Sequence, residues 1–67
     1  MLRIEMEQEA DGRWVGEAPE LPGVMAYGAT EAEARSRTAA LALRVIADRL
    51  DNGEAVPAEV RNFFAAA

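Results

Sequence analysis

The sequence predicts an α+β domain in which an antiparallel three-stranded sheet packs against one long helix, in the order β-β-β-α-β. Strict alternation of apolar and polar residues near the N-terminus is typical of a strand with one buried side. Two turn signals, Asp11-Gly12 and Pro22-Gly23, then divide the chain into short strands. A run of strong helix formers fills residues 31–51. We therefore expect residues 1–67 to form a single domain.

The first two strands are predicted to form a hairpin. Residues 2–9 place Leu2, Ile4 and Met6 on one face, as a half-buried strand requires. Asp11-Gly12 suits a tight turn, because glycine adopts positive φ without a steric clash. Residues 13–18 then return as the second strand, antiparallel to the first.

The third strand, residues 24–28, follows a second reversal of the chain. Pro19-Glu20-Leu21-Pro22-Gly23 interrupts the strand pattern, since proline cannot donate a hydrogen bond to a sheet. Thr30 then provides a helix N-cap, and Glu33 completes a capping box. Asn52-Gly53 ends the helix, because glycine accepts the left-handed conformation beyond a helix end.

The apolar residues of this helix form two stripes rather than one. A three-stranded sheet covers only one stripe easily, so we expect the other stripe to contact a second chain. In the alternative, one broad face is buried and the remaining leucines are exposed to solvent. The first stripe consists of Ala34, Leu41 and Val45; the second consists of Ala32, Ala39, Leu43, Ile46 and Leu50.

The C-terminal part of the chain is predicted less sharply. Glu54-Ala55-Val56-Pro57 has the composition of a linker, and residues 59–64 are predicted as a short last strand. Phe63 and Phe64 are adjacent, which interrupts the alternation, so a helix stays open for this segment.

Composition limits the function. Twelve acidic residues face seven arginines and no lysine, giving a net charge of −5. Direct nucleic-acid binding is therefore not expected, whereas an acidic domain attracts a basic partner. Alternatively, the acidity only keeps a small protein soluble. A core of this size supplies about 3–5 kcal/mol at most and the chain has no cysteine, so self-association or a partner is expected. No apolar run is long enough to cross a bilayer, which predicts a cytoplasmic protein.

No catalytic constellation is recognisable. Histidine, cysteine and lysine are absent, which removes the usual general base, thiolate and Schiff-base groups. Glu5, Glu7 and Glu9 share one face of the first strand, and pairs of carboxylates bind Mg²⁺, although such a row is more often a solvated surface. We expect no cofactor, no metal and no enzymatic activity.

The motifs Asp11 to Glu17, Pro19 to Val24, Gly28-Ala29-Thr30 and Glu33-Ala34 occur in a fixed order. In this order they resemble the HicB antitoxin family, and the resemblance extends from Leu2 to about Gly53. It implies a partial ribonuclease-H-like fold whose usual role is to bind and block a small basic HicA messenger-RNA interferase. Family members often carry a C-terminal DNA-binding domain, and we do not expect this chain alone to bind an operator.

The resemblance also bears on the two helix stripes. It implies that Ala34, Leu41 and Val45 face the sheet. The stripe left for an oligomer interface is then represented by Ala39, Leu43, Ile46 and Leu50.

Three functional hypotheses follow. The first is a non-catalytic module that blocks a basic HicA-like toxin; the second is a minimal metal-dependent nuclease using Glu5, Glu7 and Asp11; the third is an orphan oligomeric domain with another protein partner. For the first, Glu17 and Glu20 are candidates to pair with basic side chains of the partner. Leu21 has an alternative role as a core residue of the turn, and Trp14, the single tryptophan, has an alternative role in the core, which is the favoured one. The predicted partner-binding residues are Trp14, Glu17, Glu20, Leu21 and Tyr27.

Overall fold

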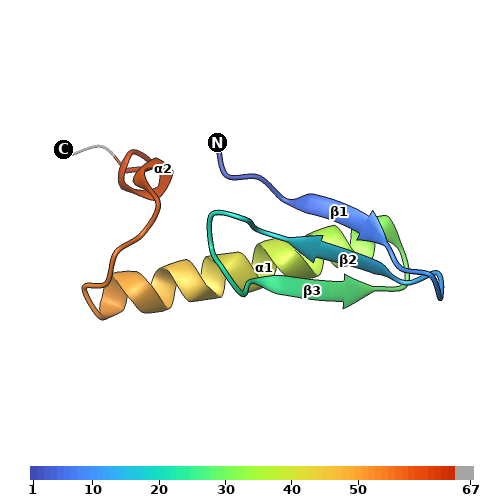
Figure 1. Cartoon of the computed structure of the whole chain (residues 1–67). Helices are drawn as coiled ribbons and strands as arrows, with labels where there is room; N and C mark the ends of the chain where they lie inside the picture. The colour runs from blue at the N-terminus through green and yellow to red at the C-terminus, as the bar shows by residue number, and fades with distance from the viewer. Residues whose placement is uncertain (65–67) are drawn as a thin grey trace.

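The structure, a computed structural model, describes residues 1–64 of the chain. Its elements are β1 (Glu5–Gln8), β2 (Trp14–Glu17), β3 (Met25–Gly28), α1 (Glu31–Asp51) and α2 (Ala58–Arg61). The strands form one antiparallel sheet in the order β1-β2-β3, and α1 runs along one face of that sheet (Figure 1). The predicted α+β class, three antiparallel strands followed by one long helix, is confirmed.

Each strand is shorter than the segment predicted for it. The hairpin closes where the Glu9 amide donates to the Arg13 carbonyl at 2.7 Å, and Gly12 takes φ +93° in the turn. Residues 2–4 lie outside β1 because the residues that would pair with them belong to the β2–β3 turn. That turn is held by amides of Leu21 and Val24, which donate to the carbonyls of Ala18 and Leu21 at 2.9 and 3.0 Å.

The long helix begins and ends as predicted. The Thr30 hydroxyl accepts a hydrogen bond from the Glu33 amide at 3.1 Å, and the Glu33 carboxylate accepts one from the Ala29 amide at 2.9 Å. This reciprocal arrangement satisfies amides that have no partner inside the helix. At the other end Gly53 adopts φ +67°, which reverses the chain beyond Asn52.

The buried line of α1 crosses from the first predicted stripe to the second, and it consists of Ala34, Thr38, Ala42 and Ile46. A Cβ atom at Gly16 would collide with the Thr38 hydroxyl, so β2 and α1 approach too closely for large side chains. The assignment of Ala34, Leu41 and Val45 as the sheet-facing stripe is therefore only partly right. Ala34 is buried, whereas Leu41 and Val45 pack at the margin of the core.

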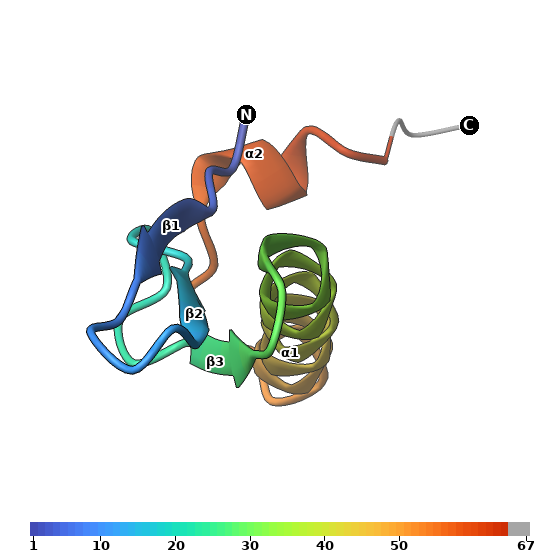
Figure 2. The same cartoon turned by 90° about the vertical axis from the view of Figure 1, so that its right-hand side faces the viewer.

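The predicted strand over residues 59–64 is wrong, and the alternative left open for this segment, a helix, is found instead. Residues Ala58–Arg61 form the single helical turn α2, with the Val60 amide donating to the Pro57 carbonyl at 2.9 Å. Val60 packs on the core, and α2 lies beside the N-terminus of the chain, where the Met1 ammonium is 3.8 Å from the Glu59 carboxylate (Figure 2). Of the helices within residues 1–64, neither has both the length and the apolar composition needed to cross a membrane.

Candidate protein-binding face

One face of the sheet is turned away from α1 (Figure 2). Gly16 lies against Thr38 of the helix, and side chains alternate between the two faces of a strand. The residues on either side of Gly16 therefore point outward, together with their cross-strand partners. We call this set the open face; it consists of Glu5, Glu7, Val15, Glu17, Met25 and Tyr27.

The strand register brings like charges together on the open face. Glu5 is the direct cross-strand partner of Glu17, and Glu7 lies diagonally from Glu17 on β1. Directly opposed like charges destabilise a sheet. The arrangement is therefore expected to lower the stability of the isolated chain.

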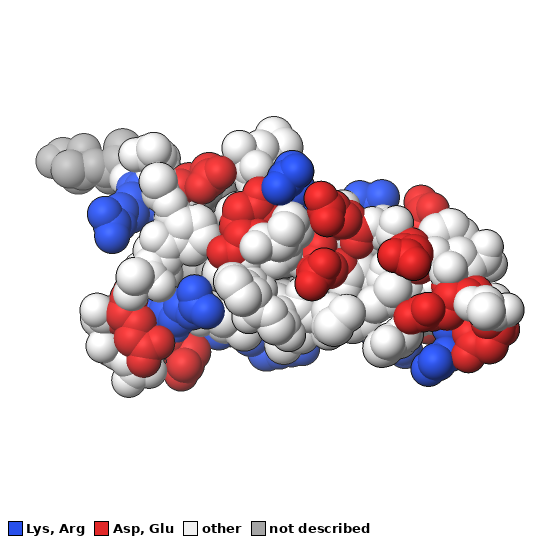
Figure 3. All heavy atoms as spheres, viewed as in Figure 1, with Lys and Arg blue, Asp and Glu red and all other residues white. Residues whose placement is uncertain are grey.

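Neutralisation of these carboxylates is incomplete. Arg3 is 3.6 Å from the Glu5 carboxylate, while Glu7 and Glu17 form no ion pair within residues 1–64. Figure 3 looks onto the sheet and shows acidic side chains gathered over it. Carboxylates in this state are ready to accept charge-assisted hydrogen bonds from arginine or lysine.

Apolar side chains lie among the acidic ones. Met25 and Tyr27 are 44% and 41% exposed on β3, next to the buried Val15. The guanidinium of Arg13 stacks over the Tyr27 ring at 4.7 Å from its centroid, which holds the ring in place. Tyrosine and methionine are enriched at protein interfaces, where charged groups surround an apolar centre.

The open face also contains a shallow hollow of about 270 Å³, bordered by side chains of all three strands. It is small for a cofactor site, since such pockets typically occupy about 300–1,000 Å³. Its border is acidic, because Glu5, Glu7 and Glu17 line it.

Glu20 lies at the side of this face and is already engaged. Its carboxylate accepts a hydrogen bond from Arg3 Nε at 3.0 Å, and its side chain is only 24% exposed. That hydrogen bond holds the pKa of the Glu20 carboxyl below its usual value and raises the pKa of Arg3. Glu20 thus ties the segment before β1 to the β2–β3 turn.

The structure separates the five predicted partner-binding residues. Glu17 and Tyr27 lie together on the open face. Trp14 is half-buried on the helix side of the sheet, opposite Gly28, and Glu20 is held by Arg3. The prediction that Leu21 contacts a partner is wrong. Leu21 is fully buried, because the turn places it against the core.

Sequence reasoning missed Glu5, Glu7, Val15 and Met25 as members of this face. The signal for the two glutamates was present in the hairpin. Once Glu9 pairs with Arg13 across the turn, counting back along both strands aligns Glu5 with Glu17.

The predicted oligomer interface is also divided. The prediction that Ile46 lies at an oligomer interface is wrong, because Ile46 is buried in the core with Leu21. Ala39 is half-buried, and Leu43 and Leu50 are 67% and 50% exposed. Only the two leucines are available to another chain.

The carboxylates of the nuclease hypothesis do not converge. Glu5 and Glu7 lie on the open face, whereas Asp11 is in the hairpin turn. The Asp11 carboxylate accepts hydrogen bonds from the Arg13 backbone amide at 3.0 Å and from Arg13 Nε at 2.8 Å. The amide of Arg13, followed by its side chain, holds the pKa of Asp11 below its usual value. In the described part of the chain no three acidic side chains come together in a way that could hold a metal ion.

Comparisons with protein-family models, curated proteins and solved structures give no significant match to this chain.

Proposed function

We propose that the chain is a non-catalytic binding domain whose open face holds a small basic protein. The observation that carries this proposal is the placement of Glu7 and Glu17, without ion-pair partners among the described residues, beside the exposed Met25 and Tyr27. An acidic rim around an aromatic and a methionine side chain offers a basic partner both charge complementarity and an apolar contact.

The partner class follows from the sequence. The resemblance of Asp11 to Glu17 and Pro19 to Val24 to HicB antitoxins supports a messenger-RNA interferase of the HicA type as the partner. Such an enzyme must carry positive charge to hold RNA phosphates. An acidic face that covers this positive surface blocks RNA binding by competition and needs no chemistry of its own. The proposed compartment is the cytoplasm, where messenger RNA is translated.

Co-expression tests this function. The candidate partner is any small basic protein encoded next to this gene; it is expressed alone and together with the chain, and growth is measured. We expect the neighbour alone to stop growth and the wild-type chain to restore it.

Two charge-reversal variants make the test specific to the open face. Glu7→Arg with Glu17→Arg should fail to restore growth, because an arginine at each position repels the basic partner. Asp51→Arg with Glu54→Arg is the matched control: it changes the net charge equally at exposed positions beyond the sheet. If circular dichroism shows that both variants are folded and both restore growth equally, the proposal is contradicted.

A further inference from the structure

The helix α1 extends well beyond the sheet that covers it. Its 21 residues span about 32 Å, whereas strands of four residues span roughly 13 Å. The radius of gyration is 13.3 Å, against about 11 Å for a compact chain of this length. Figure 1 shows the C-terminal half of α1 projecting past the strands. This half carries the exposed Leu43 and Leu50.

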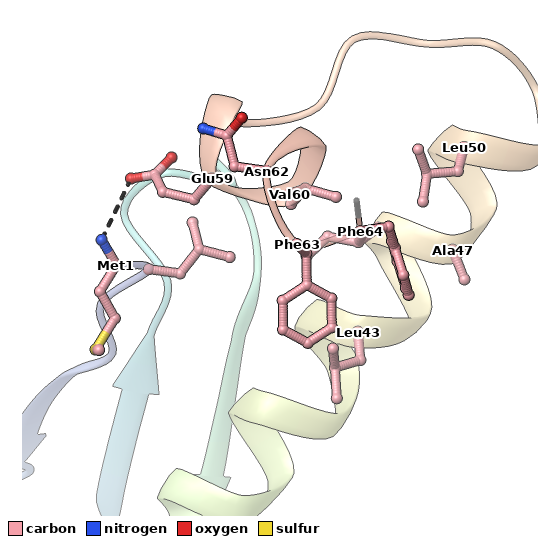
Figure 4. Close-up of a pocket in the computed structure, with 11 residues that line it drawn as sticks. Met1, Leu43, Ala47, Leu50, Glu59, Val60, Asn62, Phe63 and Phe64 are labelled. Atoms are coloured by element: carbon pink, nitrogen blue, oxygen red, sulfur yellow. Dashed lines mark ion pairs between the residues drawn. The ribbon is translucent and has the colours of Figure 1, made fainter. Parts of the chain in front are cut away.

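The segment after α2 presents a second exposed apolar element. Phe63 and Phe64 are 78% and 75% exposed, and their rings meet edge to face at 5.1 Å. Together with Leu43 and Leu50 they line an apolar groove of about 670 Å³ between α1 and α2 (Figure 4). Met1 is exposed at the same groove. Single exposed apolar residues are ordinary, but five large ones around one groove indicate a binding surface.

The charge of the chain is distributed unevenly along the sequence. Residues 1–33 contain eight acidic residues and two arginines, a net charge of −6. Residues 34–67 contain four acidic residues and five arginines, a net charge of +1. Two copies that meet through α1 and α2 therefore escape the repulsion that two acidic sheets would produce.

We propose that the occupant of this groove is a second copy of the chain. The two copies pair about a two-fold axis, and each places Phe63 and Phe64 against Leu43 and Leu50 of the other. Such an isologous contact uses the same patch twice, and this patch contains both the protruding rings and the leucine surface that receives them.

The area available is sufficient for a weak dimer. Each copy contributes Phe63, Phe64, Leu43 and Leu50, which are all at least half exposed. Together the eight side chains of a dimer would bury on the order of 1,000 Å². That value is at the lower limit for specific interfaces, so a dissociation constant in the micromolar range is expected. The open face stays free for the basic partner.

Sedimentation equilibrium of the chain alone tests the dimer. Between about 1 µM and about 500 µM the wild type should change from the 7.2 kDa monomer to twice that mass. Leu43→Arg and Phe63→Glu should each weaken dimerisation by roughly tenfold or more. Both positions are exposed, so the variants should keep the wild-type circular dichroism spectrum. Ser36→Arg, exposed on the same helix outside the groove, is the matched control and should dimerise normally.

A mixing experiment tests the reciprocal contact. Equal amounts of Leu43→Arg and Phe63→Glu chains should form a mixed dimer, because one contact is then wild type and the other pairs arginine with glutamate. A wild-type chain that stays monomeric at about 500 µM, or mixed variants that do not associate, would overturn the proposal.

A different occupant has a distinct outcome. If the wild type is monomeric and Leu43→Arg lowers the affinity for the basic neighbour protein, the groove belongs to that partner and the dimer is refuted. The proposed function is judged separately, by the variants at Glu7 and Glu17.

Discussion

Replacement of Glu17 by glutamine is expected to stabilise the isolated chain while it weakens partner binding. Glu17 lies directly opposite Glu5 in the sheet. Two unit charges separated by about 5 Å, the spacing of directly opposite Cβ atoms, repel by about 0.8 kcal/mol in a water-like dielectric. The cross-strand pairs measured in other sheets fall in the same range, about 0.2–1 kcal/mol. Because Arg3 already offsets part of the Glu5 charge, we expect a gain of about 0.5 kcal/mol.

Thermal unfolding followed by circular dichroism measures this gain. A change of about 0.5 kcal/mol corresponds to a rise in Tm of roughly 2–4 °C for a domain of this size. The protein concentration must be equal in all samples, since dimerisation also shifts Tm. At about 1 M salt the Debye length falls to about 3 Å, so the difference between Glu17→Gln and wild type should disappear.

The direction of the Tm change in Glu17→Gln shows whether Glu5 and Glu17 repel one another. Glu54→Gln removes an equal charge at an exposed position away from the open face and should leave Tm nearly unchanged. If Glu17→Gln unfolds at or below the wild-type temperature in low salt, the carboxylates do not repel one another. The interpretation of the open face as a surface that costs stability would then be wrong.

Three further variants test contacts that hold the fold together. In Gly28→Ala the new Cβ would lie 2.5 Å from the backbone nitrogen of Ala34, so urea unfolding should show a loss of about 1–3 kcal/mol; an unchanged midpoint would refute this packing. Thr30→Ala removes the helix cap and should cost about 1 kcal/mol in the same assay. Arg3→Gln should return the pKa of Glu20 toward its usual value, as measured by NMR titration. Because the folded-state pKa of Glu20 is lowered, the stability that wild type has over Arg3→Gln is present above the usual carboxyl pKa and is lost as the pH falls through the lowered value. An identical Glu20 titration in both proteins would contradict the ion pair.

The local signals in the sequence were strong enough to predict the main elements. Asp11-Gly12 and Pro22-Gly23 mark turns through backbone preferences that do not depend on the rest of the fold, and Thr30 with Glu33 defines the start of α1 in the same way. The segment after Pro57 lacks such signals, and its conformation depends on where Val60 meets the core. For this reason the predicted last strand is a helical turn.

The buried line of α1 could not be found from large apolar residues alone. The close approach at Gly16 requires small partners, so Thr38 and Ala42 are buried while Leu43 is exposed. Hydrophobic periodicity gives weight to leucine and little to threonine, so the predicted stripes include Ala34 and Ile46 but not the buried Thr38 and Ala42.

The residues of the candidate site could also be predicted only in part from the sequence. Glu17 and Tyr27 were found because they stand out as charged and aromatic residues near the second turn. Glu5 joins them only through the register, which is a property of two strands together. Leu21 stood out equally in the sequence, yet the turn buries it.

The measurement that tests the central claim most directly is NMR mapping of the chain during titration with the small basic protein encoded beside it. The account predicts that amide and side-chain signals of the open face change first, notably those of Glu7, Glu17 and Tyr27, and that added salt weakens the changes. Changes confined to the groove around Leu43 and Phe63, with the sheet signals unmoved, would contradict the assignment of the open face as the partner-binding surface.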